Sequence, residues 1–249
     1  MSNREDLTVA EALKAVLDGV PVLSAEAVPI LDALNRVLAE SVVAADSLPP
    51  FANSSMDGYA VRADDVATAC SQTPATLLVV GDIAAGSVPT VTIDSREAAR
   101  IMTGAPLPPG ADAVVPVEDT NERWRDGERP LSSHIQISRA VQPGDYVRGI
   151  GEDIQAGQIV LAQGHILRPQ EIGVLASLGI SHVRVIRRPR VAILATGDEL
   201  LPVEAALQPG KIRNSNGYAQ TSQVQALGAD PIFLGIARDT EEDVRDKLQ

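Results

Sequence analysis

The sequence predicts a multidomain α/β protein, because its texture changes three times along the 249 residues. Residues 1–48 and 145–187 mix helical and strand patterns, residues 49–144 alternate short apolar runs with turns, and residues 188–249 alternate strand and helix. Short strands separated by turns are typical of a β-rich domain, and strand–helix alternation is typical of a doubly wound sheet. We therefore expect a discontinuous mixed α/β domain, an inserted β-rich domain, and the first half of a doubly wound domain.

The mixed α/β part opens with an amphipathic helix. Thr8 and Glu11 have the spacing of a capping box, and apolar residues follow at helical intervals as far as Gly19. A second helix is expected at 168–179, where Pro169 suits the first turn.

The inserted segment carries short runs typical of strands, namely TLLVVG, TVTI, DAVVPV and HIQISRAV. REAARIM, at 96–102, is instead expected to form a helix. The charged, turn-rich segment at 120–133 is expected to be a mobile hairpin tip.

The last part of the chain has two apolar runs, at 190–197 and 230–237. We expect both to be parallel strands, the first covered on both faces. A helix is expected between them at 214–228, and another after Thr240.

Charge and composition exclude several classes of function. The 33 acidic and 21 basic residues give a net charge of −12, which disfavours nucleic acid or membrane partners. The single cysteine, Cys70, excludes an internal disulfide, and the first residues lack a signal-peptide pattern. We expect a cytoplasmic protein. The sequence has no GxSxG, P-loop, HExxH or GxGxxG motif to support a hydrolase, NTPase, zinc protease or dinucleotide oxidoreductase.

Polar residues follow both apolar runs of the last part. Glu199 follows the first and Asp239 the second, and ligands of open α/β sheets bind beyond the carboxyl ends of strands. Two carboxylates in one crevice would suit Mg²⁺, and the helix start at Asn214, Ser215 and Asn216 offers N–H groups to an anion. The alternative is that the acids cap helices at surface loops, and position alone does not decide between the two.

Three further loops could contribute to a site. In residues 49–62, a Pro-Pro pair stiffens the approach to Asp57, which is either part of a hairpin entry or held toward a ligand. Thr103 and Gly104 could cradle a phosphate or form an ordinary turn. Asp153 lies between glycines, where a turn is the simpler interpretation.

Long motifs in this order resemble the MoeA family of molybdopterin molybdenumtransferases, which is related to the gephyrin E domain. The motifs are NSSMDGYAVR, RIMTGAPLPPGADAVVPVED, GEDIQAGQIV, LASLGISHVRVIRRPRVAILATGDEL and IRNSNGYAQTSQVQALGAD followed by LGIARD. The resemblance covers essentially the whole chain.

The resemblance implies a role in molybdenum cofactor biosynthesis. Family members insert molybdate into adenylylated molybdopterin and release AMP with the assistance of Mg²⁺. It implies a homodimer whose cleft lies between the barrel-like β-rich domain of one subunit and the doubly wound, molybdopterin-binding domain of the other. The mixed α/β domain would serve dimerisation, with the first helix packing on the third domain. The molybdopterin adenylyltransferase that delivers substrate is an expected partner.

The resemblance also implies roles for individual residues. Catalytic roles fall on Asp57, Thr103, Glu199 and Asp239, with Glu199 and Asp239 as metal ligands. Substrate-binding roles fall on Asp153, Ser55, Gly104, Thr196, Gly197, Asn214, Ser215 and Asn216.

The family pattern continues beyond the last residue of this sequence, Gln249, through GGVSxG and PGKP-like segments and a further small β domain. We therefore expect a C-terminally truncated chain. The alternative function is a non-catalytic dimeric fragment or scaffold that binds substrate or partner without turnover.

Overall fold

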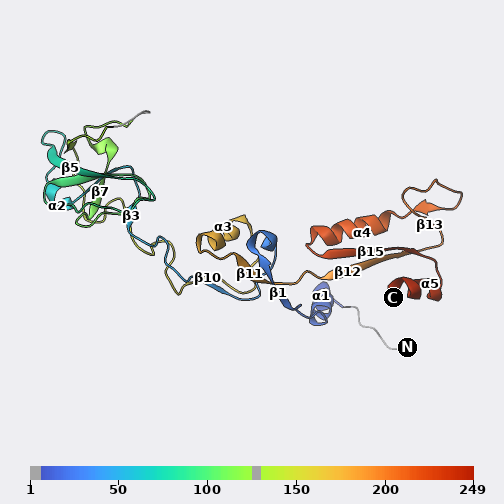
Figure 1. The fold of residues 1–249 in the computed structure, drawn as a ribbon. Helices are drawn as coiled ribbons and strands as arrows, with labels where there is room; N and C mark the ends of the chain where they lie inside the picture. The colour runs from blue at the N-terminus through green and yellow to red at the C-terminus, as the bar shows by residue number, and fades with distance from the viewer. Residues whose placement is uncertain (1–6, 125–129) are drawn as a thin grey trace. The chain divides into compact units, whose positions relative to one another are not determined.

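The computed structural model describes residues 7–124 and 130–249, and the chain divides into two compact units (Figure 1). Unit 1 is formed by Met1–Val42 and Leu161–Gln249, and unit 2 by Val43–Val160. Each unit is described by itself below. The multidomain α/β fold is confirmed, whereas the finer three-part boundaries remain a prediction.

Unit 2 is built on a curled sheet of five strands in the order β7-β4-β6-β5-β8. The strands are β4 (Gly58–Val61), β5 (Ala75–Ile83), β6 (Glu97–Ile101), β7 (Ala113–Pro116) and β8 (His134–Ile137). All neighbours are antiparallel except β5 and β6, which run parallel. Two apolar clusters pack against this sheet, so the sheet is the core of the unit.

The predicted helix at 96–102 is wrong, because this segment forms the central strand β6. Ala98 packs in one apolar cluster of unit 2, whereas Ala99 and Ile101 pack in the other. Alanine favours helix in isolation, but pairing with β4 and β5 buries all three side chains. Tertiary packing therefore overrides local propensity here.

The predicted strand TVTI, at 90–93, is also wrong, since this segment is irregular. Val91 packs against Gly81, and Ile93 is buried with its N–H donating 2.8 Å to the carbonyl of Pro109. The apolar residues of this segment are therefore packed in a loop and are not paired with a neighbouring strand.

Short elements complete unit 2. They are β2 (Val42–Val43), β3 (Asn53–Ser54), α2 (Ala63–Val66), η2 (Val117–Asp119), β9 (Val147–Arg148) and β10 (Ile159–Leu161). Two of them, β2 and β10, each include one residue of unit 1. β3 pairs with β9 in antiparallel fashion, and β10 lies beside β2.

The start of the predicted hairpin tip at 120–133 is anchored to the core. Glu122 accepts hydrogen bonds from the hydroxyl of Tyr59 at 2.6 Å and from Trp124 Nε1 at 2.9 Å, and also from Ser132. Burial and the hydrogen bond to Glu122 raise the pKa of Tyr59. The predicted mobility of the remainder of the tip falls on residues 125–129, which lie outside the described residues.

One part of unit 1 contains a two-stranded sheet and two helices. Its elements are α1 (Val9–Asp18), β1 (Ala25–Pro29), η1 (Ile30–Ala33), α3 (Pro169–Ser177) and β11 (His182–Ile186), with β1 antiparallel to β11. Both predicted helices are confirmed, and Thr8 makes the expected capping box with Glu11. α1 buries none of its residues, and its packing on another domain stays a prediction.

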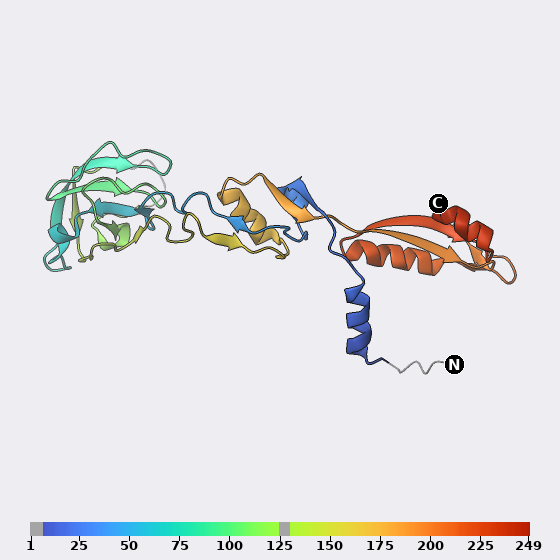
Figure 2. The same cartoon turned by 90° about the horizontal axis from the view of Figure 1, so that it is seen from below.

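The other part of unit 1 contains two parallel strands, β12 (Arg190–Thr196) and β15 (Asp230–Ala237). The remaining elements are β13 (Leu200–Leu201), β14 (Ile212–Arg213), α4 (Ser215–Ala226) and α5 (Glu241–Leu248). Figures 1 and 2 show α4 and α5 on opposite faces of the strands, the layering of a doubly wound sheet.

The expected full burial of β12 is wrong for this chain. Of its seven residues, only Ile193 is buried, since β15 is the one neighbour that β12 has among the described strands. No helix among the described residues combines the length and the apolar character that crossing a membrane requires.

Candidate functional site

The predicted site residues form two groups, one in each unit. In unit 2, the first group is built around the loop that precedes β4. Ser54 is fully buried, and its hydroxyl accepts a hydrogen bond from the N–H of Met56 at 3.2 Å, which shapes the turn. Gly58 then brings the chain so close to β7 that a Cβ would lie 2.0 Å from the carbonyl oxygen of Val115. Asp57 is therefore presented at a position that the backbone fixes on both sides.

The carboxylate of Asp57 is held by Thr103. Its Oδ1 accepts hydrogen bonds from the backbone N–H of Thr103 at 2.8 Å and from the Thr103 hydroxyl at 2.7 Å. Gly104 follows with φ +80°, a conformation that favours glycine, and donates 2.8 Å to the carbonyl of Ser54. The structure thus brings Asp57, Thr103 and Gly104 together, with all three exposed.

Two other predicted residues, Ser55 and Asp153, make contacts with the segment around β9. Ser55 donates its N–H to the carbonyl of Tyr146 at 2.9 Å. Asp153 forms an ion pair with Arg148, which lies opposite Asn53 in the β3–β9 pair. Ser55 and Asp153 are thus connected to the β3–β9 pair, of which β3 precedes the Asp57 loop in the chain, and these contacts do not join them to Asp57 or Thr103 directly.

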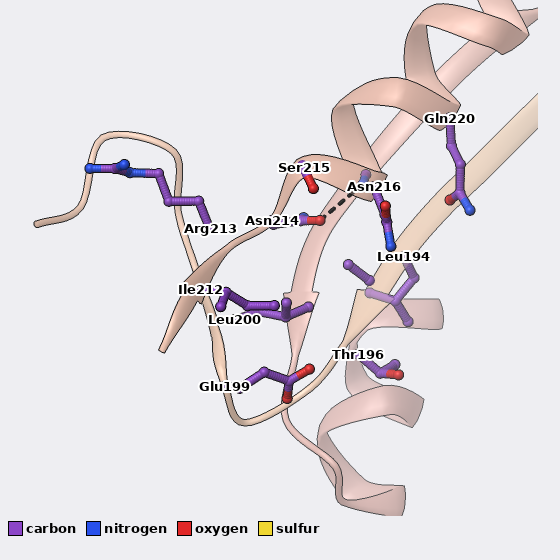
Figure 3. A pocket seen from close by; sticks show the side chains of 12 residues that line it. Leu194, Thr196, Glu199, Leu200, Ile212, Arg213, Asn214, Ser215, Asn216 and Gln220 are labelled. Carbon is purple, nitrogen blue, oxygen red and sulfur yellow. Dashed lines mark hydrogen bonds between the residues drawn. The ribbon is translucent and has the colours of Figure 1, made fainter. Parts of the chain in front are cut away.

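The second group lines a cavity of about 260 Å³ in unit 1. Figure 3 shows Glu199 and Thr196 at one end of it and the first turn of α4 at the other. Five predicted residues line it, namely Thr196, Glu199, Asn214, Ser215 and Asn216.

Gly197 makes room for the carboxylate of Glu199. A Cβ on Gly197 would lie 2.6 Å from Glu199 Oε2, and the glycine has φ +151°. The Glu199 side chain is exposed and accepts no hydrogen bond from the described part of the chain. Its oxygens are therefore available to a ligand, and carboxylate oxygens are the donors that Mg²⁺ prefers.

The helix start is organised by Asn214, the N-cap residue of α4. Asn214 is 2% exposed, and its Oδ1 accepts a hydrogen bond from the N–H of Gly217 at 2.9 Å. Its Nδ2 is buried without a partner among the residues that the structure describes. A buried donor beside the positive end of a helix suits an anionic ligand.

The structure does not place Asp239 in the cavity that contains Glu199, where the sequence predicts a shared metal site. Thr196 pairs with Ala237 in the parallel ladder, so the carboxyl ends of β12 and β15 are neighbours as expected. Asp239 nevertheless does not line the cavity that contains Glu199. Across the described residues, no cluster of three or more His, Cys, Asp or Glu side chains is arranged to hold a metal. A metal held by both acids stays a prediction.

Sequence reasoning missed the other seven residues that line the cavity, and Gln220 and Gly217 are two of them. Gln220 lies one helical turn after Asn216 and lines the same cavity, a spacing that could have revealed it. Gly217 is required because a Cβ would lie 2.7 Å from Asn214 Nδ2 and 2.8 Å from the ring of Phe233. No local pattern in the sequence signals that second contact.

Comparisons with known proteins give the family. Residues 7–179 match the model of the MoeA N-terminal region (domain I and II), and residues 192–249 match a probable molybdopterin binding domain. The chain is 39% identical over 239 residues to a molybdopterin molybdenumtransferase of Bacillus subtilis, covering 96% of this chain and 55% of that protein. It is 42% identical over 212 residues to molybdopterin molybdenumtransferase 2 of Mycobacterium tuberculosis, covering 85% and 50%.

A solved structure is similar over the same length. The molybdopterin biosynthesis MoeA protein from Pyrococcus horikoshii OT3 matches with a TM-score of 0.84 and 35% identity, over 96% of this chain and 62% of that one. The chain spans about half the length of the curated relatives it matches. From the motifs, the fold and these matches, the chain belongs to the MoeA family.

Proposed function

We propose that the chain acts in molybdenum cofactor biosynthesis, where adenylylated molybdopterin receives molybdate and AMP is released. The observation that carries this proposal is the unpartnered carboxylate of Glu199 in a cavity that also contains the start of α4. The Glu199 carboxylate oxygens can bind a cation, and the start of α4 can bind an anion. A substrate that contains phosphate groups needs both.

In this proposal, Glu199 holds Mg²⁺ together with Asp239. When bound, the ion would neutralise charge on the pyrophosphate linkage and polarise it. Asn214, Ser215 and Asn216 bind an anionic group of the substrate through the helix start and the unpartnered Nδ2. These residues orient the linkage, while Thr196 lines the cavity beside Glu199 and Gly197 leaves room for the Glu199 carboxylate.

We further propose that the Asp57 group acts across a homodimer. Thr103 fixes the carboxylate of Asp57, so this acid can orient a substrate without moving. Ser55, Gly104 and Asp153 would complete the substrate contacts of that subunit. The other proposed partner is the adenylyltransferase that delivers the substrate.

One observation favours a second candidate, a non-catalytic dimer or scaffold that binds substrate or partner. The chain spans about half the length of the curated relatives it matches, so substrate binding by these residues and turnover are separate questions. AMP release by this chain distinguishes the two candidates, because the scaffold binds substrate without turnover.

The test is AMP release from adenylylated molybdopterin with Mg²⁺ and molybdate. We expect Glu199→Gln to lower the rate at least about 100-fold, because it removes the charge that binds the cation. Glu204→Gln is the matched control, since Glu204 is exposed in the loop between β13 and β14 and does not line the cavity. An unchanged rate in Glu199→Gln overturns the role of Glu199, and a parent chain that binds substrate without releasing AMP supports the scaffold.

A further inference from the structure

Four arginines lie close together in the sequence around the connection between β11 and β12, in a chain whose net charge is −12. They are Arg184, Arg187, Arg188 and Arg190, and all four are exposed. We call this set the arginine cluster. It lies at the start of β12, whereas Glu199 follows the end of that strand, about 20 Å farther along its seven residues. The cluster is therefore separate from the residues to which the proposed function assigns a role.

Neighbouring carboxylates do not neutralise the arginine cluster. The Nε of Arg184 lies 3.9 Å from Glu40 Oε2, and both side chains are exposed, so this ion pair is weak. The other three arginines form no ion pair with any carboxylate in the described part of the chain. This holds even for Arg190, although Asp230 lies opposite it in the parallel ladder. The cluster thus keeps an excess of positive charge that is exposed to solvent.

The cluster borders a cavity of about 430 Å³ at the amino ends of β12 and β15, within unit 1. Arg188 lines this cavity, and Asn35, from the segment after η1, lines it as well. Apolar side chains from the end of α4 and the start of β15 form part of the wall, among them Ala226, Pro231 and Leu227, which is 80% exposed. The cavity therefore combines a guanidinium group with an apolar surface.

A role for Arg188 in ending α4 does not explain its position. The last carbonyls of the helix already accept backbone hydrogen bonds: Gly228 donates to Gln225 at 2.9 Å, and Ala229 donates to Val224 at 3.1 Å. No hydrogen bond joins the Arg188 guanidinium to this helix end among the residues that the structure describes. Its donors are available to a partner.

The chemistry of the cluster favours carboxylates of a peptide over a nucleic acid. Arginine binds a carboxylate through two parallel N–H donors. At about 100 mM salt, charges more than about 10 Å apart are largely screened, so a short acidic segment responds to the cluster. A long polyanion would also meet the acidic remainder of the chain. Of the described residues that line the cavity, none is aromatic, so bases have no side chain on which to stack.

We propose that the arginine cluster and the adjoining cavity form a docking surface for an acidic peptide segment of a partner protein. Carboxylates of the segment pair with Arg187, Arg188 and Arg190, and an apolar side chain between those carboxylates enters the cavity beside Leu227. Docking of this kind goes beyond the proposed function, because it requires neither substrate binding nor turnover.

The test is isothermal titration of this chain with a blocked peptide of sequence EELEE. We expect binding with a Kd below about 1 mM at about 100 mM salt, weakened at least about tenfold at about 500 mM salt. The peptide EEGEE should bind at least about threefold more weakly, because it has no apolar side chain for the cavity. Absence of EELEE binding up to about 10 mM, or equal binding of the peptide KKLKK, overturns the proposal.

The double variant Arg187→Gln with Arg188→Gln should weaken EELEE binding at least about tenfold, because two of the charged donors are removed. Neither side chain makes an ion pair among the described residues, so the fold should persist, as far-UV circular dichroism would verify. The matched control is Arg123→Gln with Arg245→Gln, which changes the net charge equally at exposed residues that do not line the cavity. Equal weakening by both double variants would reveal a net-charge effect and overturn the docking surface.

Two further measurements identify other occupants of the same surface. An oligothymidylate of about twelve nucleotides should bind more weakly than EELEE. Tighter binding of the oligonucleotide that is lost in the Arg187→Gln, Arg188→Gln variant would identify a nucleic acid as the partner and overturn the proposal. Light scattering should give the same mass for this variant and the parent chain. A lower mass for the variant would show that the cluster contacts a second copy of this chain, which also overturns it.

Discussion

The loops that carry Asp57 and Glu199 place an exposed acid beside a glycine, but they use the acid differently. Asp57 accepts two hydrogen bonds from Thr103, so its carboxylate is part of the local fold. Glu199 accepts none from the described residues and faces a cavity. The Asp57 carboxylate is therefore held in one position by the protein, whereas the Glu199 carboxylate has both oxygens available to a ligand.

The glycines beside these acids show the same contrast. At Gly58 a Cβ would collide with backbone, the carbonyl oxygen of Val115 at 2.0 Å. At Gly197 a Cβ would collide with the end of a side chain, the carboxylate of Glu199 at 2.6 Å. Backbone in a sheet cannot yield, whereas a side chain can rotate.

The largest effect is therefore expected from Gly58→Ala. It should lower the free energy of unfolding of unit 2 by at least about 3 kcal/mol, because β4 and β7 must separate. Trp124, the only tryptophan, lies in unit 2 with its ring centroid 5.9 Å from that of Tyr59, so urea unfolding followed by its fluorescence reports on this unit. Gly197→Ala should leave that transition unchanged and displace the Glu199 carboxylate.

The control for these variants is Gly173→Ala. Gly173 lies within α3, and a Cβ there would meet nothing within 4 Å. Alanine should stabilise the helix by roughly 0.5–1 kcal/mol, as followed by far-UV circular dichroism, and should leave the Trp124 transition of unit 2 unchanged. A Gly58→Ala protein that unfolds at the same urea concentration as the parent would contradict the close approach of β4 and β7.

A smaller effect is expected from removing the acids themselves. Asp57→Ala should cost about 1 kcal/mol in unit 2, because the N–H and hydroxyl of Thr103 lose a charged acceptor. Glu199→Ala should change stability by less than about 0.5 kcal/mol, since no hydrogen bond is lost. Trp124 fluorescence measures the first variant and far-UV circular dichroism the second. If both variants lost the same free energy of unfolding, the Asp57 carboxylate would contribute no more to stability than the Glu199 carboxylate, and the proposed difference between the two loops would be wrong.

Much of unit 1 could be predicted from the sequence, because its signals are local. The capping box at Thr8, the helix with Pro169 at its start, and the apolar runs at 190–197 and 230–237 all formed the expected elements. The parallel pairing of those runs then placed Glu199 beside a helix start. The predicted second acid, Asp239, lies outside the Glu199 cavity, because neighbouring strand ends do not fix the direction of the loops that follow them.

Unit 2 depends more on contacts between distant residues. The burial of Ala98 and Ala99 turned an expected helix into the central strand β6. The bonds that join Asp57 to Thr103 span 46 positions, and those that join Glu122 to Tyr59 span 63. Local pattern cannot foresee pairs so far apart, although the residue types had marked Asp57 and Thr103 as candidates.

The central claim is that the Asp57 group of one subunit and the Glu199 group of another act on one substrate. Co-expression of Asp57→Asn and Glu199→Gln chains, each inactive alone, tests it most directly by measuring AMP release. In a statistical mixture half of the dimers are hybrids with one intact site each, so the account predicts about one quarter of the parent activity. A mixture no more active than the separate variants would contradict a shared site.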